Sequence, residues 1–120
     1  MRRGEVWLIN LAPTVGAEIQ KTRPAVIVND DAIGVLPLRV IVPITEWKEH
    51  YAVAPWMVYL EPEAGNGLDK PSSADAFQVR SVAEERFVRR ERFVRRLGRL
   101  SATAMQEITR ALAIVLSMEP

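Results

Sequence analysis

Residues Pro13 to Asn29 read P-T-V-G-A-E-I-Q-K-T-R-P-A-V-I-V-N, and this stretch joins two apolar segments, Glu5–Asn10 and Ala25–Val28. The connection has no hydrophobic periodicity, whereas a β-hairpin needs only about 2–5 loop residues and long structureless loops in compact domains are commonly functional. Arg23 stands directly before a proline, which keeps its backbone extended. The stretch therefore predicts a functional loop that presents a cation at a strand entry. Taken alone, it also fits a solvated arginine beside an edge-strand proline.

Length and composition predict one domain over residues 1–120. The absence of cysteine excludes disulfide bonds, thiol catalysis and thiolate metal sites, and it fits a reducing compartment. No apolar run approaches the roughly 18 residues of a membrane span, and Gly4 and Glu5 interrupt any signal-peptide pattern. We therefore expect a soluble, cytoplasmic protein without membrane contact.

The net charge is only +1, but seven arginines lie between Arg86 and Arg99. They belong largely to a tandem copy, in which R-F-V-R-R-E (Arg86–Glu91) is followed at once by R-F-V-R-R-L (Arg92–Leu97). This basic stripe fits either an electrostatic footprint for nucleic acid or a solvated charged face. Good helix formers surround the copy, which predicts a short helical or looped protrusion outside the core, ending near Leu97.

Apolar and β-branched segments predict five strands, namely Glu5–Asn10, Ala25–Asn29, Leu38–Ile44, Trp56–Leu60 and Ala74–Ala83. Within the first strand, Trp7 is expected in the core. Pro43 is expected to mark an edge strand or the end of the third strand. Asp30 and Asp31 predict a capped helical turn through Ile33, and Asn66-Gly67 predicts a hairpin.

A helix is predicted at the C-terminus. Ser101 is a candidate N-cap, and a capping box from Thr103 to Gln106 is the rival start. One face of this helix carries the apolar residues Met105, Ile108, Leu112, Val115 and Leu116, and the pattern runs through Met118. The predicted fold class is mainly β with a C-terminal helix.

Six segments, in order, carry a family resemblance: R-G-E-V-W-L (3–8), P-T-x-G-x-E-x-x-x-x-R-P (13–24), V-P-I-T (42–45), L-D-K-P-S-S (68–73), Q-V-R-S-V (78–82) and L-G-R-L-S-x-x-x-M (97–105). The ordered set resembles the MazF/PemK toxins of toxin–antitoxin systems over almost the whole chain. The resemblance implies an SH3-like small barrel that acts as a sequence-selective, metal-independent endoribonuclease, or mRNA interferase. It also implies a homodimer, a MazE-like antitoxin as partner, single-stranded RNA as substrate, and no cofactor.

The resemblance assigns the catalytic roles to Arg23 and Thr45, which match the family's catalytic arginine and threonine. RNA-binding roles are predicted for Glu18, Lys21, Ser73 and Gln78. The chain departs from some members at Ala17, where they have a hydroxyl residue, and from others at Lys21, where they have glycine. These departures concern loop flexibility and RNA preference more than activity.

The residue inventory agrees with cleavage by the 2′-hydroxyl of the RNA itself. His50 is the only histidine, so one protomer cannot supply a histidine acid–base pair, and no H-E-x-x-H motif or phosphate-binding G-x-x-x-x-G-K-[ST] loop is present. Arg23 suits charge stabilisation on a phosphate, and the Thr45 hydroxyl can donate to a non-bridging oxygen. The general base stays open, with Glu18 the nearest candidate in sequence. The products implied by the resemblance are a 2′,3′-cyclic phosphate and a 5′-hydroxyl.

Two alternative functions share this fold. The CcdB toxins bind DNA gyrase without being nucleases, but they resemble W-G-I at the C-terminus, where this chain ends S-M-E-P. The other alternative is an inactive barrel that binds RNA or protein, which only the tandem copy favours.

Overall fold

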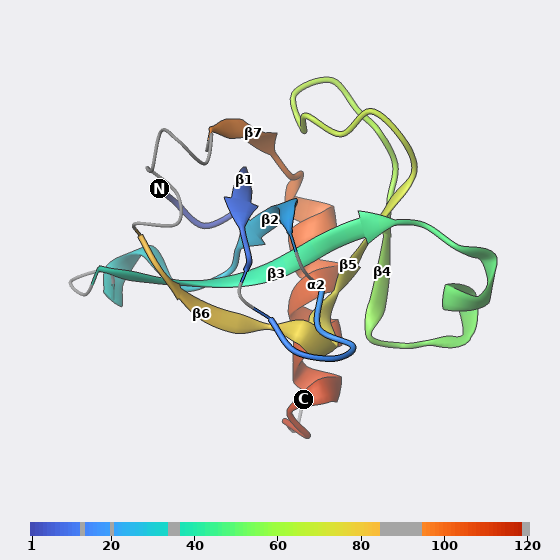
Figure 1. Ribbon diagram of the computed structural model, residues 1–120. Coiled ribbons are helices and arrows are strands. Elements are labelled where there is room, and N and C mark those ends of the chain that lie inside the picture. The colour runs from blue at the N-terminus through green and yellow to red at the C-terminus, as the bar shows by residue number, and fades with distance from the viewer. Residues whose placement is uncertain (13, 20, 34–36, 85–94, 119–120) are drawn as a thin grey trace.

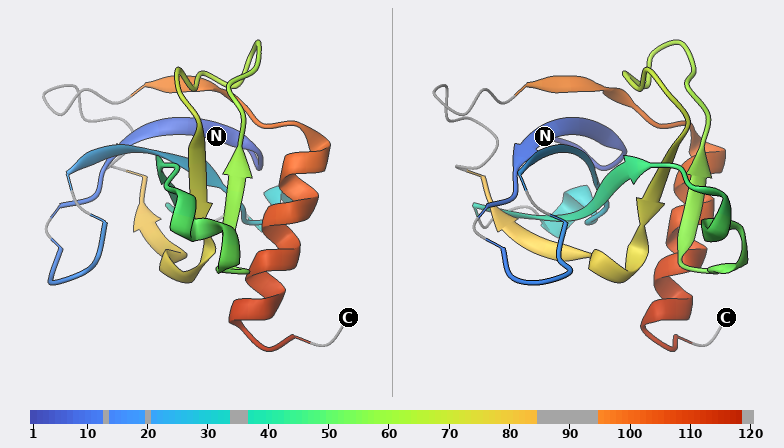
Figure 2. Two further views of the ribbon diagram at one scale, coloured as in Figure 1. Left: turned by 90° about the vertical axis from the view of Figure 1, so that its right-hand side faces the viewer. Right: turned by 45° about the vertical axis from the view of Figure 1, so that its right-hand side comes forward.

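The computed structural model describes residues 1–12, 14–19, 21–33, 37–84 and 95–118. A strongly curled sheet stands beside one long helix (Figures 1 and 2). The strands are β1 (Glu5–Asn10), β2 (Thr22–Ile27), β3 (Leu38–Glu46), β4 (Met57–Leu60), β5 (Ser72–Asp75), β6 (Arg80–Ala83) and β7 (Arg96–Arg99), and the helix is α2 (Ala102–Val115). The strand order is β4-β5-β3-β2-β1-β7, with β6 paired to β3. The predicted class, a mainly β small barrel with a C-terminal helix, is confirmed.

Strand β3 is the centre of the sheet. One of its edges pairs antiparallel with β2, whereas the other pairs with β6 through Leu38–Ile41 and with β5 through Ile44–Glu46. On the edge shared by β6 and β5, Pro43 lies in the gap between the two ladders, and a missing N–H there removes no ladder hydrogen bond. On the opposite edge, Pro43 stands in register with Ala25 of β2. The prediction that Pro43 marks an edge strand or a strand end was therefore wrong.

The predicted single strand Ala74–Ala83 is divided by a short 3₁₀ helix, η3 (Ala76–Gln78). The Asp75 carboxylate accepts a hydrogen bond of 3.1 Å from the Phe77 amide, which caps this turn. As a result β5 and β6 follow two successive segments of the curled β3. The alternating side chains of Ala74–Ala83 predicted one continuous strand, but the cap by Asp75 favours a 3₁₀ turn in its middle.

Strand β7 was not predicted; it pairs antiparallel with β1. It includes Arg96 and Leu97 from the second copy of the arginine-rich hexad. Residues 85–94, which hold most of the duplication and of the predicted protrusion, lie outside the described residues.

Other predicted elements agree closely with the structure. Strand β1 has the predicted bounds, whereas β2 begins and ends earlier than predicted, β3 extends through Glu46 and β4 begins one residue late. The predicted turn through Ile33 is present as η1 (Asp31–Ile33), where Asp30 accepts from the Ala32 amide at 2.8 Å. The Ser101 hydroxyl caps α2 by accepting from the Ala104 amide at 3.1 Å, so the rival capping box was wrong, and the helix ends at Val115 instead of Met118.

The apolar core has two parts. One part lies between the sheet and α2 and includes Val42, Ile44 and Ile108, all almost fully buried. The other lies inside the curl of the sheet and includes Ile9, Leu11, Ile27, Ile41 and Val82. Trp7 packs against this second part, as predicted for a core residue. In the described ranges, no helix has the length and apolarity that a bilayer crossing requires.

The loop between β4 and β5 is fixed to β7 through glycines. A Cβ on Gly67 would lie 2.3 Å from the Leu97 carbonyl oxygen, and one on Gly98 would lie 2.3 Å from the Gly65 oxygen. The buried Asn66 side chain adds three hydrogen bonds inside the loop, as donor to the Glu61 oxygen and as acceptor from the Glu63 and Leu68 amides. This loop, which contains Asn66-Gly67 and closes the predicted hairpin between β4 and β5, is therefore held in place by β7 and by the Asn66 side chain.

The Glu5 carboxylate is a buried anchor that makes stability depend on pH. Burial by itself raises the pKa of Glu5. Hydrogen bonds from the Trp7 indole and the Arg2 amide lower it, as do the positive charges of the N-terminus and Arg96, and the net result is a pKa below the usual 4.5. The folded pKa is below the unfolded one, so this stabilisation is complete above about pH 4.5 and is lost as pH falls through the folded pKa.

We expect Glu5→Gln to lower the unfolding free energy at pH 7 by about 1–2 kcal/mol, because the hydrogen bonds from Trp7 and Arg2 lose their charged acceptor and the ion pair with Arg96 is lost. Urea unfolding from pH 3 to 7 should show a shallower acid dependence than the wild type, with the exposed Glu49→Gln as matched control. An unchanged acid dependence in Glu5→Gln would contradict this assignment.

Candidate active site

Arg23 and Thr45 line the same cleft, which has a volume of about 260 Å³. The β2–β3 register pairs Ala25 with Pro43, and two further residues along an antiparallel pair place Arg23 opposite Thr45. Arg23 is exposed and Thr45 is partly buried. The structure therefore brings the two predicted catalytic residues together at the end of a strand pair.

Four charged residues that sequence reasoning did not assign also line this cleft: Glu46, Asp69, Lys70 and Arg95. With Arg23, the lining holds three cations and two carboxylates, and Lys70 Nζ lies 3.7 Å from Glu46 Oε1. Both partners of this ion pair are exposed, so it is weak and can yield to a phosphate. The cleft is thus weakly cationic, as a phosphodiester site requires.

One signal in the sequence pointed to Lys70. Lys70 precedes Pro71 and enters β5, just as Arg23 precedes Pro24 in β2. Each proline holds the preceding cation on an extended backbone. Arg95 belongs to the arginine stripe that fits a nucleic-acid footprint, but its place in the cleft could not be predicted, because β7 itself was not predicted. Within the described part of the chain, no three histidine or carboxylate side chains gather so that they could hold a metal ion.

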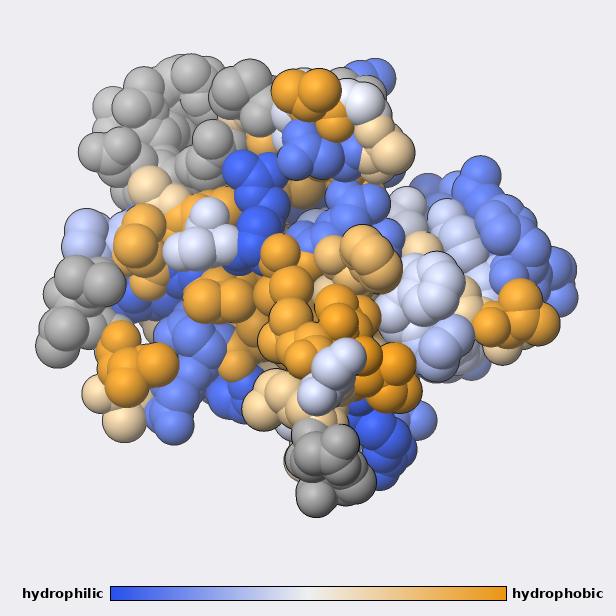
Figure 3. Space-filling model, turned by 90° about the horizontal axis from the view of Figure 1, so that it is seen from below, coloured by the Kyte–Doolittle hydropathy of each residue, from blue (hydrophilic) through white to orange (hydrophobic). Residues whose placement is uncertain are grey.

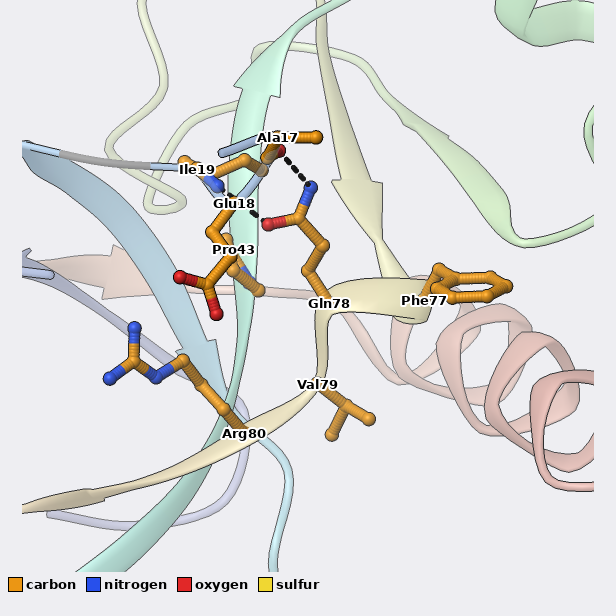
Figure 4. A pocket seen from close by; sticks show the side chains of 8 residues that line it. All are labelled: Ala17, Glu18, Ile19, Pro43, Phe77, Gln78, Val79 and Arg80. Atoms are coloured by element: carbon orange, nitrogen blue, oxygen red, sulfur yellow. Dashed lines mark hydrogen bonds between the residues drawn. The ribbon is translucent and has the colours of Figure 1, made fainter. Parts of the chain in front are cut away.

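A second pocket, of about 470 Å³, contains Glu18 and Gln78 (Figure 4). Gln78 fastens the β1–β2 loop, because its Oε1 accepts from the Ile19 amide at 2.6 Å and its Nε2 donates to the Ala17 oxygen at 3.4 Å. Glu18 closes the turn of the same loop by accepting from the Val15 amide at 2.5 Å. Both residues therefore shape the loop as well as the pocket.

The two pockets adjoin along β3. Pro43 lines the second pocket, and the next residues, Ile44 to Glu46, line the cleft. Glu18 is not among the residues that line the cleft with Arg23 and Thr45. The structure thus separates Glu18 from the predicted catalytic pair.

The two remaining predicted RNA-binding residues lie outside both linings. Ser73 is paired with Thr45 across the β3–β5 ladder and is fully buried, with its hydroxyl donating to Met57 Sδ at 3.2 Å. Lys21 is exposed and has a φ of 70°, in the left-handed region that favours glycine. Lys21 therefore has a backbone conformation that glycine adopts more readily than lysine.

A curled sheet with one C-terminal helix is the fold of a class of toxins. The family described as PemK-like, MazF-like toxin of type II toxin-antitoxin system matches residues 2–116, and the chain belongs to this family. It is 34% identical over 124 residues to endoribonuclease MazF9 of Mycobacterium tuberculosis, covering 98% of each protein. It is also 34% identical over 118 residues to endoribonuclease PemK of Escherichia coli, covering 98% of this chain and 83% of that protein.

A solved structure has the same fold. The crystal structure of MazF from Deinococcus radiodurans matches with a TM-score of 0.76 and 25% identity, covering 98% of this chain and 97% of that one. The family resemblance and the fold expected from the sequence motifs are confirmed.

Proposed function

We propose that this chain, as a single domain, is an endoribonuclease toxin that cuts single-stranded RNA at selected sequences without a metal ion. The observation that supports this most directly is the shared cleft of Arg23 and Thr45, whose lining carries more cations than carboxylates. The names of the two relatives above, both endoribonucleases, point the same way.

In the proposed reaction, the 2′-hydroxyl of the RNA attacks the adjacent phosphorus atom and the bond to the 5′-oxygen breaks. The leaving 5′-oxygen takes up a proton from solvent water, so the products are a 2′,3′-cyclic phosphate and a 5′-hydroxyl. The planar Arg23 guanidinium stabilises negative charge on the phosphate oxygens, and the Thr45 hydroxyl donates to one of them. The 2′-hydroxyl proton goes to a carboxylate that lines the cleft, Glu46 or Asp69, because Glu18 lies in the other pocket.

The RNA is proposed to run along β3, from the cleft into the second pocket. Glu18 and Gln78 would contact bases in that pocket, and Phe77 on its rim is 65% exposed and offers a face for stacking. Lys21 would meet the RNA backbone as it enters. The buried Ser73 is proposed to support the strand segment that carries Thr45.

The protein partners are proposed to be a second copy of the chain and a MazE-like antitoxin, in the cytoplasm. The family description, which is of a toxin from a type II toxin-antitoxin system, supports an antitoxin as partner. The underside of the molecule has exposed apolar groups (Figure 3), and the exposed apolar side chains near the end of α2 and at η3 are Phe77, Ile114, Leu116 and Met118. Such a surface suits contact with another protein.

A substrate with one 2′-deoxyribose immediately 5′ of the scissile phosphate tests the proposal. We expect the protein to bind this substrate with unchanged affinity and to leave it uncut, because the attacking group is missing. The all-ribose RNA should be cut equally fast with and without EDTA, and end mapping should find the cyclic phosphate. Cleavage of the deoxy substrate would show that water is the nucleophile, and loss of activity in EDTA would show that a metal is needed.

A further inference from the structure

Asp75 is a buried carboxylate at the end of β5, and the proposed reaction does not use it. Its side chain is almost completely enclosed, with 5% of the residue exposed. One oxygen accepts from the Phe77 amide at 3.1 Å, and the other accepts from Gln78 Nε2 at 3.2 Å. Burial raises the pKa of Asp75, and these hydrogen bonds oppose that rise. A buried acid held in this way needs a reason that the cap of η3 alone does not supply.

Gln78 connects this carboxylate to the β1–β2 loop. Its Oε1 accepts from the Ile19 amide at 2.6 Å, and its Nε2 donates to the Ala17 oxygen (Figure 4). The same Nε2 also donates to Asp75 Oδ2. The Ile19 amide can only donate, and an ionised carboxylate can only accept. Asp75 therefore selects the one orientation of the Gln78 amide that presents an acceptor to the loop.

The position of the loop depends on this link. Ala17, Glu18 and Ile19 form one wall of the second pocket, and residues of η3 and β6 form the opposite wall. Gln78 supplies hydrogen bonds from the η3 side to two of the three loop residues. Without them the wall that carries Glu18 loses its polar attachment to the rest of the pocket.

We propose that Asp75 is a positioning residue for RNA binding, which acts through the orientation of Gln78 to hold the β1–β2 loop against η3. The inference rests on the proposed function for its link to RNA, but the hydrogen-bonded link itself can be measured independently. In this proposal, the shape of the second pocket depends on the buried Asp75 carboxylate, which does not itself touch the RNA.

The test exchanges donor and acceptor. In Asp75→Asn, the amide oxygen keeps the hydrogen bond from the Phe77 amide that caps η3, since the reverse orientation would set two donors together there. The new Nδ2 therefore faces Gln78 Nε2, and turning the Gln78 amide over would set Nε2 against the Ile19 amide instead. Either arrangement opposes two donors, so we expect the Ile19 amide to exchange with solvent about tenfold faster. We also expect KM for RNA to rise about tenfold with kcat changed less than about threefold, because ground-state and transition-state contacts are lost equally.

Adding Gln78→Glu to Asp75→Asn restores an acceptor for Ile19 and gives the new amide at position 75 a carboxylate to which it can donate. Only the 3.4 Å contact with Ala17 is given up. We therefore expect the double variant to recover most of the Ile19 protection, whereas Gln78→Glu alone sets two carboxylates together and does not. Failure of the double variant to restore protection, while it remains folded, would overturn the proposal.

A second route covers the case in which a charge exchange prevents folding. Gln78→Ala removes the link without altering the buried acid, so adding Asp75→Asn to it should cause no further change in Ile19 exchange or KM. A further loss would show that Asp75 acts independently of Gln78. Ser101→Ala, a helix-cap variant distant in sequence from the loop, is the control for general destabilisation. If the wild type cuts no RNA, the proposed function fails, and the Ile19 exchange still decides the link.

Discussion

Arg23→Ala is expected to lower kcat for RNA cleavage by about 10²–10³, the usual loss when one preorganised group that stabilises the transition state is removed. The side chain is exposed, so the thermal unfolding midpoint should remain close to that of the wild type. Arg23→Lys should recover only part of the rate, because an ammonium keeps the charge and loses the planar fork that fits a phosphate. Single-turnover cleavage of a defined RNA measures all three proteins.

The matched control is Arg110→Ala, which removes an exposed arginine from α2, outside both pocket linings. It should cut RNA at the wild-type rate. Near-normal cleavage by folded Arg23→Ala would remove Arg23 from the mechanism. Equal losses in both arginine variants would show that overall charge, and not the cleft, governs the reaction.

Gly98→Ala is expected to cause the largest loss of stability, about 3 kcal/mol or more, because overpacking against backbone cannot be relieved by a rotamer change. The new Cβ would lie 2.3 Å from the Gly65 carbonyl oxygen, so β7 and the β4–β5 loop would have to separate. Asp69 and Lys70 from this loop line the cleft together with Arg95, and cleavage by the folded fraction should fall as well. Urea unfolding followed by circular dichroism measures the stability.

Gly16→Ala provides the contrast. Its backbone is left-handed, with φ at 61°, but a Cβ there would meet nothing within 4 Å. Only the backbone cost applies, which is about 1 kcal/mol. If both alanine variants lose the same small amount, the close approach of β7 to the loop is not maintained in solution.

The elements that could be predicted were those that local pattern determines. The apolar segment Glu5–Asn10 became β1 without adjustment, and the Ser101 cap and the helix followed from a side-chain hydroxyl and a 3.6-residue period. Arg23 and Thr45 were found through motif resemblance. The register of β2 with β3 then brings them into one cleft, whereas their catalytic roles stay a prediction.

The rest depended on contacts between distant segments. The division of Ala74–Ala83 into two strands could not be predicted, because it depends on the hydrogen bond from the Phe77 amide to Asp75 and on the curl of β3. Lys70 and Arg95 enter the cleft only because two glycine backbones let the β4–β5 loop lie against β7. The separation of Glu18 from the cleft likewise follows from the attachment of the loop to Gln78, which no local pattern reveals.

The pairing of β7 with β1 also bears on the order in which the protein is made. Strand β1 is made before β7, so one of its two edges stays open until β7 has been made. Arg95 and Leu97, which line the cleft, and Ile108, which fills the core, are all made after β6. A nascent chain thus lacks one side of its cleft until β7 has been made.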